Sequence, residues 1–129
     1  MYSMIFLIIK DLFLFLNSFH FSKNLFAKIK SKFRLAGYLR ATGSGHHVQI
    51  SHRLRQYFGL PLLKPEDMIG QMNRLKNEMK ELVTQLNPEE QRAFNQLHNY
   101  IIRTWMIGYG PEQVSVFGAP YKTNNINER

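Results

Sequence analysis

The amino-acid sequence predicts a mainly α-helical domain that contains a basic helix and an antiparallel helical hairpin. Three observations support this prediction. Apolar residues recur at steps of three and four, proline stands at the start of two such segments, and one strongly basic segment has the same helical spacing. The length of 129 residues fits one domain, and 44% hydrophobic and 20% charged residues are typical of a globular chain. The absence of cysteine excludes disulfides, thiolate zinc sites and cysteine nucleophiles.

The first 18 residues form an apolar segment that stands apart from the rest. Two apolar runs, at residues 2–9 and 12–16, are separated by Lys10 and Asp11. A membrane-spanning helix needs about 20 apolar residues with few charges. A signal peptide needs a positive start and a small-residue cleavage site. Neither pattern is present, so we expect a buried segment, or a stretch appended without selection for folding, and we do not expect a membrane or secretory role.

Residues 22–39 are predicted to form a basic amphipathic helix, because one face is apolar and the lysines occupy the other. The expected apolar stripe consists of Leu25, Phe26, Ile29, Phe33 and Ala36. Gly43 and Gly45 then mark a flexible break. His46 and His47 follow it and are expected in an exposed loop, since no carboxylate lies near them to complete a metal site.

The net charge of +8 is concentrated in residues 23–55, which carry eight cations and no Asp or Glu. These candidate nucleic-acid-binding residues are Lys23, Lys28, Lys30, Lys32, Arg34, Arg40, Arg53 and Arg55. Such asymmetry indicates a surface for a polyanion, with nucleic acid favoured over a membrane, although a solvated basic face without a partner is the alternative. Four to six phosphate contacts would give a log–log salt slope of roughly −4 to −5.

A second helix is predicted at residues 48–58, with Leu54, Tyr57 and Phe58 facing inward. A third is predicted at 65–86, after a connector at 59–65 in which Pro61 and Pro65 act as helix breakers. Its apolar seam comprises Met68, Met72, Leu75, Met79, Leu82 and Leu86. A fourth helix is expected at 88–107, capped by Asn87 and buried through Phe94, Leu97, Ile101 and Trp105. The third and fourth helices most simply pack as an antiparallel hairpin. Association through the seam, as in a short coiled coil, is the alternative.

The segment after the fourth helix is expected to turn at Gly110 and then to form a short strand with Val114, Val116 and Phe117. Residues 123–125 (TNN) offer a helix cap, and Glu128 falls within the first turn of the helix that would follow. Because the sequence ends at the next residue, we expect a truncated helix.

Residues 19–129 resemble part of the ribonuclease-H-like DDE domain of Mutator-like element transposases. The resemblance rests on the segment YIIRTW at 100–105, a Gly-Pro turn, SVFG at 115–118 and TNNINE at 123–128. In that family, an aromatic-Arg-x-Trp helix precedes a V-(Y/F)-G strand and a T-N-N-x-x-E motif. Residues 19–25 (FHFSKNL) resemble the start of the family's helical insertion. His20 would occupy a vestigial Cys-x-x-His position, where Asn17 replaces the cysteine.

The resemblance implies an α/β transposase domain, of which this chain would hold the helical insertion and the C-terminal motif. In the complete family enzyme, three carboxylates bind two Mg²⁺ or Mn²⁺ ions that drive in-line attack on phosphate. Glu128 would be the third carboxylate. Neither Asp11 nor Asp67 matches the two catalytic aspartates. The chain is therefore expected to be a truncated, catalytically inactive remnant that binds no metal or other cofactor and retains weak, nonspecific DNA binding.

Two other functions remain as alternatives. One is a small helical interaction module that associates through the Met/Leu hairpin, with a second copy or with another protein. The other is peripheral membrane attachment through the apolar N-terminus beside the basic helix. The expected location is nuclear or cytoplasmic.

Overall fold

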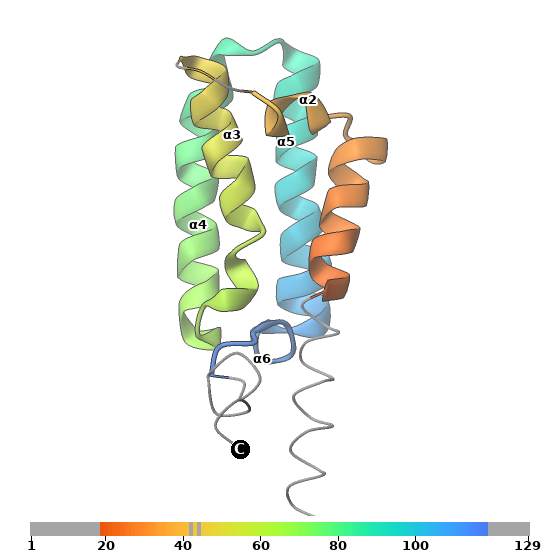
Figure 1. Cartoon of the computed structure of the whole chain (residues 1–129), viewed down its shortest axis with the longest axis vertical. Coiled ribbons are helices and arrows are strands. Elements are labelled where there is room, and N and C mark those ends of the chain that lie inside the picture. Colours follow the sequence, from red (N-terminus) through yellow and green to blue (C-terminus); the bar gives the residue numbers. More distant parts are fainter. Residues whose placement is uncertain (1–18, 42, 44, 119–129) are drawn as a thin grey trace, which may run out of the picture.

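The computed structural model describes residues 19–41, 43 and 45–118, and within these residues the chain forms helices joined by short connections, without a strand. Four helical segments run alternately up and down (Figure 1). They are residues 19–32, α3 (His46–Tyr57), α4 (Pro65–Leu82), and α5 (Pro88–Tyr100) with its continuation η4 (Ile101–Tyr109). The predicted mainly α-helical class is therefore confirmed.

The first helical segment is shorter than predicted. Residues 19–27 are α-helical, and η1 (Lys28–Lys32) continues them as a π-helix. Arg34 then adopts a φ of 55°, in the left-handed region, and the short helix α2 (Ala36–Leu39) follows as a separate element. The prediction of one continuous helix over residues 22–39 is therefore wrong, because a left-handed residue cannot lie inside a right-handed helix.

The buried face of this segment comprises Phe21, Leu25, Ile29 and Phe33, at regular steps of four. Phe26, which we expected in the stripe, is 49% exposed. It directly follows Leu25 and therefore points to a neighbouring face of the helix. Phe21 packs edge-to-face against Trp105 of η4, with ring centroids 5.2 Å apart, so the first segment lies against the last one.

Helix α3 begins after Gly45, whose φ of 122° favours glycine. His46 and His47 form its first turn, so the prediction that they lie in a loop is wrong. Leu54 and Tyr57 are buried as predicted, and Phe58 is half-buried against the core. The 3₁₀ turn η2 (Leu60–Leu62) then leads into α4.

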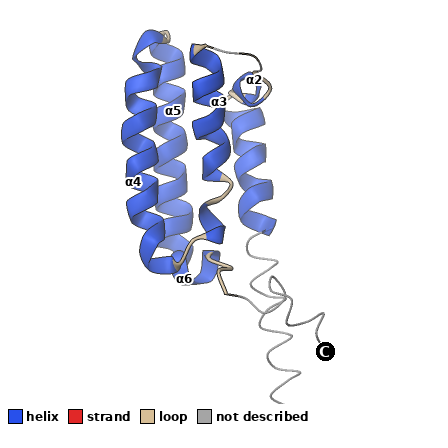
Figure 2. Ribbon diagram, turned by 60° about the vertical axis from the view of Figure 1, so that its left-hand side comes forward, coloured by secondary structure: helices blue, strands red, loops and turns tan. Residues whose placement is uncertain are grey.

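Helices α4 and α5 form the predicted antiparallel hairpin, as Figures 1 and 2 show from two directions. Met68, Met72, Leu75 and Met79 are buried. Leu82 and Leu86 are only half-buried, because α4 tightens into the 3₁₀ turn η3 (Val83–Gln85) and turns Val83 inward in their place.

The start of α5 is as predicted. The side-chain oxygen of Asn87 accepts a hydrogen bond from the Glu90 backbone N–H at 2.8 Å, and Pro88 occupies the first helical position. Phe94, Leu97, Ile101 and Trp105 are all buried.

After Gly110, whose φ is 93°, the chain forms α6 (Pro111–Val114) and then a non-helical segment. The predicted strand is absent from the described residues. The described residues offer no neighbouring strand, and the backbone pairs with the α3–α4 connection instead. The Val116 N–H donates to the Pro61 carbonyl at 2.8 Å, and the Ser115 hydroxyl donates to the Leu63 carbonyl. Val114 and Val116 are buried, whereas Phe117 is 55% exposed.

The apolar segment 1–18, the TNN cap at 123–125 and Glu128 lie outside the described residues. Among the helices that are described, none combines the length and the apolar character needed to cross a membrane.

Candidate nucleic-acid interface

The eight candidate cations lie on three parts of the fold. Lys23, Lys28, Lys30 and Lys32 belong to the first helical segment. Three of them are exposed, and Lys28 is half-buried. Arg34 and Arg40 are exposed at the two ends of α2, and Arg53 and Arg55 lie on α3. The structure therefore does not place all eight on one surface.

The two arginines of α3 have partners within the chain. Arg53 Nε lies 2.7 Å from Glu78 Oε1 on α4, and Arg55 Nη2 donates to the Leu39 carbonyl at 2.6 Å. Glu78 also pairs with Arg74 at 3.1 Å. These contacts hold α3 against its neighbours, so Arg53 and Arg55 are less available to an external anion than the lysines are.

A groove runs between the first helical segment and the α5–η4 helix. It consists of two adjoining cavities of about 610 and 350 Å³, which share Lys32, Tyr100 and Thr104. Lys28, Lys32 and Arg103 supply three cations to its walls, and among the described residues no carboxylate lines either cavity. The remaining residues that line the groove are Asn24, Ala27, Ser31, Phe33, Gln96, Asn99, Tyr100, Thr104, Trp105 and Tyr109.

Besides Phe33, three aromatic side chains of the α5–η4 helix contribute to this groove. The rings of Trp105 and Tyr109 are stacked, with centroids 4.7 Å apart and planes 16° apart. Trp105 Nε1 donates to the Tyr100 hydroxyl at 3.0 Å, and Lys28 Nζ lies 5.4 Å from the centroid of the Tyr100 ring. Tyr109 is 51% exposed, whereas Trp105 is buried. Burial raises the pKa of Tyr100, which keeps its hydroxyl neutral.

The groove lies where both π-helical segments of the described chain meet. In η1 the Phe33 N–H donates to the Lys28 carbonyl at 2.9 Å, and at the end of η4 the Gly110 N–H donates to the Trp105 carbonyl at 2.9 Å. Each bond spans five residues. Such wide turns are rare and occur frequently at functional sites. The coincidence of two of them marks the groove as the candidate site.

Sequence reasoning missed three residues of this groove, namely Tyr100, Arg103 and Tyr109. Tyr100 and Arg103 fall within the predicted fourth helix and were noted only in the resemblance segment at 100–105, whereas Tyr109 lies two residues beyond the predicted end of that helix. The available signal was the polar and aromatic composition of the adjacent face, which packs beside the basic helix in the folded chain.

The structure identifies no metal site in the part of the chain that it describes, since no three His, Cys, Asp or Glu residues gather there. His20 is exposed, and its ring lies 6.1 Å from the ring of Phe19.

Comparisons with protein-family models, with curated proteins and with solved structures gave no match.

Proposed function

We propose that this chain binds DNA without sequence preference, and that the groove between the first helical segment and α5–η4 is the binding site. The supporting observation is the meeting of Lys28, Lys32 and Arg103 with exposed aromatic surface in a groove that no carboxylate from the described part of the chain lines. Cations neutralise phosphates, and aromatic side chains accept the faces of unpaired bases.

Several features favour binding without sequence preference. Lysine contacts phosphate as a point charge and carries no information about the base. Every base has a face that can stack on a tyrosine, so the exposed ring of Tyr109 does not discriminate between sequences. The residues that line the groove extend over positions 24–33 of the first helical segment and 96–109 of α5–η4, so the groove runs along the two helices and suits a nucleic-acid backbone that lies along them. Figure 1 shows these two helices side by side.

We also propose that the chain derives from the helical insertion of a Mutator-like transposase and that it does not cut DNA. The support for this origin is the resemblance of the sequence motifs to those of the family. A helical bundle at residues 19–109 is compatible with an insertion of that kind. Within the 129 residues only Glu128 stands in a motif that matches a catalytic carboxylate, and one carboxylate cannot hold two metal ions.

The proposal is tested by fluorescence anisotropy with a labelled DNA of about 20 nucleotides, longer than the site of one small binding domain. Single-stranded and duplex forms of two unrelated sequences are titrated at several salt concentrations. Three groove contacts predict a log–log slope of about −2.7 or steeper on duplex DNA. The affinity should be the same for both sequences.

The double variant Lys28→Gln/Lys32→Gln should flatten that slope by about 1.8, because two contacts are lost. The matched control is Lys76→Gln/Lys80→Gln, which removes the same charge from α4, away from the groove. Equal loss of affinity in both variants would show that DNA binding depends on net charge and not on the groove. Undetectable binding of the wild-type chain to DNA at low salt would contradict the proposal.

A further inference from the structure

The first helical segment has an exposed face that does not belong to the groove. It consists of Phe19, Lys23, Phe26 and Lys30, which follow one another at steps of four, three and four and therefore share one side of the helix. We call it the Phe/Lys face. All four side chains are exposed, the two phenylalanines by 53% and 49%, and none of the four lines the groove. Figures 1 and 2 both show this segment at the edge of the bundle.

The lysines of the Phe/Lys face keep their positive charge without a partner among the described residues. Neither Lys23 nor Lys30 forms an ion pair there. The sequence contains no Asp or Glu between Asp11 and Glu66, so the neighbouring positions supply no anion either. A second copy of the chain packed on this face would bring lysines against lysines, and like charges repel. The charge therefore favours an anionic occupant.

The phenylalanines of this face expose apolar surface that the bundle does not cover. The sequence pattern placed Phe26 in the buried stripe, but Phe21, Leu25 and Ile29 fill the core instead. In a helix that lies at a membrane surface, aromatic rings enter the boundary between headgroups and acyl chains, while the flexible stems of lysines extend to the headgroups. The alternation of phenylalanine and lysine along one face fits that environment.

The part of the sequence that directly precedes this face is also apolar. Residues 2–9 and 12–16 form two apolar runs, and the second run ends three residues before Phe19. A membrane surface accommodates an apolar segment together with the two rings. A nucleic acid binds through phosphates and base faces and offers no such apolar environment. This continuity favours a lipid surface over a polynucleotide at the Phe/Lys face.

We propose that the Phe/Lys face binds the surface of an anionic phospholipid membrane, with Phe19 and Phe26 in the interface and Lys23 and Lys30 at the lipid headgroups. The bundle itself remains outside the bilayer, since the opposite side of the same segment packs through Phe21 against Trp105. The face is separate from the groove, so this attachment does not depend on the proposed DNA binding.

The experiment measures co-sedimentation of the full chain with vesicles of phosphatidylcholine and phosphatidylserine in a two-to-one ratio, and with vesicles of phosphatidylcholine alone. Each lysine near an anionic membrane surface strengthens binding by about fivefold. The wild-type chain should therefore bind the anionic vesicles at least about tenfold more tightly than the neutral ones. Absence of binding to the anionic vesicles at low salt would overturn the proposal.

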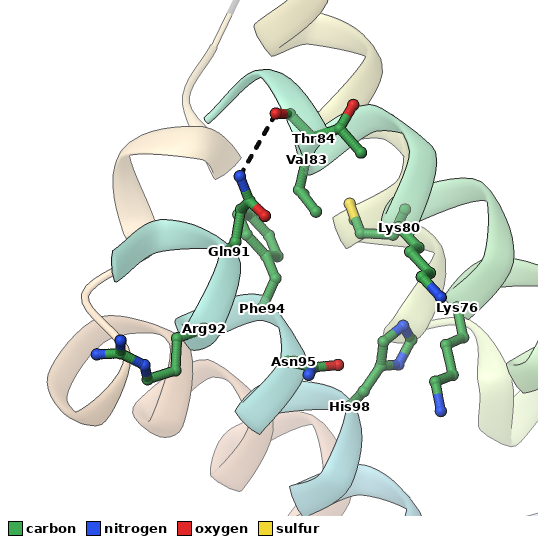
Figure 3. Close-up of a pocket in the computed structure, with 10 residues that line it drawn as sticks. Lys76, Lys80, Val83, Thr84, Gln91, Arg92, Phe94, Asn95 and His98 are labelled. Carbon is green, nitrogen blue, oxygen red and sulfur yellow. Dashed lines mark hydrogen bonds between the residues drawn. The ribbon is translucent and has the colours of Figure 1, made fainter. Parts of the chain in front are cut away.

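The charge of the face is tested by Lys23→Gln/Lys30→Gln, which should weaken binding to the anionic vesicles by about 25-fold because two lysines are lost. The matched control is Lys76→Gln/Lys80→Gln. It removes the same charge from α4, where Figure 3 shows both side chains at the cavity between α4 and α5, and it should have a much smaller effect. Equal weakening in the two variants would show that only net charge attracts the chain, and would contradict a defined face.

The apolar half of the face is tested by Phe19→Ser/Phe26→Ser, which should weaken vesicle binding at least about tenfold, because two rings no longer leave water. Leu62→Ser/Ile69→Ser is the matched control, since these side chains are 55% and 50% exposed on η2 and α4 and should not be required. Circular dichroism checks that every variant folds.

The same variants are titrated with DNA, which separates the two proposals. If the Phe/Lys variants lose affinity for DNA and keep their binding to vesicles, the face belongs to the DNA-binding surface and the membrane proposal is wrong. Vesicle binding that neither Phe/Lys variant weakens would likewise contradict it. Failure of DNA binding through the groove leaves the vesicle result unchanged, because the groove is probed by different lysines.

Discussion

At the scale of single residues, the pair formed by Tyr57 and His98 stands out because both side chains are buried and polar. The Tyr57 hydroxyl lies 2.8 Å from His98 Nε2, and this bond joins α3 to α5. Burial, aided by the positive charge of Lys76, lowers the pKa of His98 to about 4, and burial raises the pKa of Tyr57. Both groups are therefore neutral at physiological pH.

Because of this pair, the free energy of unfolding depends on pH. The pKa of His98 falls from 6.5 in the unfolded chain to about 4 in the folded one, so the unfolded chain binds the proton more readily. The full stability is present above pH 6.5 and decreases as the pH falls towards 4, by up to about 3 kcal/mol. Urea unfolding at a series of pH values measures this loss. His98→Gln should remove most of the dependence between pH 6.5 and 4, whereas His52→Gln, at an exposed position, should leave it intact.

A second residue-scale prediction compares two leucines of the same helix. Leu75 is fully buried, whereas Leu82 is only half-buried where α4 ends. Leu75→Ala should cost about 3 kcal/mol of unfolding free energy, because it leaves a cavity in the core. Leu82→Ala should cost about 1 kcal/mol, since much of its side chain already contacts water. Equal costs in chemical denaturation would contradict the burial that separates the two positions.

At the scale of elements, the cap of α5 allows a direct test. The Asn87 side chain both accepts from the Glu90 N–H and donates to the Glu90 carboxylate, each at 2.8 Å. Asn87→Ala should destabilise the protein by about 1 kcal/mol. Asn77→Ala, an exposed substitution inside α4, should be neutral or slightly stabilising because alanine is the better helix former. Thermal unfolding followed by circular dichroism measures both.

Helices with local sequence signals could be predicted from the sequence, whereas features that depend on packing between helices could not. The seam of α4 and the cap at Asn87 were readable because spacing and capping act within a few residues. The π-helical winding of η1 was not readable. In an α-helix, residues spaced four apart are rotated by about 40° relative to one another around the helix axis, so an apolar row at this spacing gradually leaves one face. The wider π-helical turn keeps the row on one face, and it forms here because the packing partner requires that face to be buried.

The groove was only partly predictable for the same reason. Lys28 and Lys32 were recognised because they lie in a run of cations. Tyr100, Arg103 and Tyr109 are distant in sequence and become relevant only when the last helix packs beside the first. The break at Arg34 was missed as well, since an arginine in the left-handed region carries no sequence signal.

At the scale of the whole molecule, the proposed loss of catalysis makes a clear prediction. Incubation with Mg²⁺ or Mn²⁺ should produce no nicking or joining of any duplex, because the metal pair that polarises the phosphate needs several carboxylates. Agarose gels of supercoiled plasmid detect a single nick and provide the measurement. Metal-dependent nicking that disappears in Glu128→Gln would contradict the prediction and restore an enzymatic function.

The contact of Phe21 with Trp105 joins the first helical segment to the last, and this has a consequence for the order in which the chain assembles. Helices α3, α4 and α5 follow one another and can pair as they are synthesised, whereas contacts between distant segments form later because a long loop must close. The groove therefore arises only at the final closure. A nascent chain on the ribosome has no groove until residues up to Tyr109 have emerged, so the proposed DNA binding through it requires the chain at least to that residue.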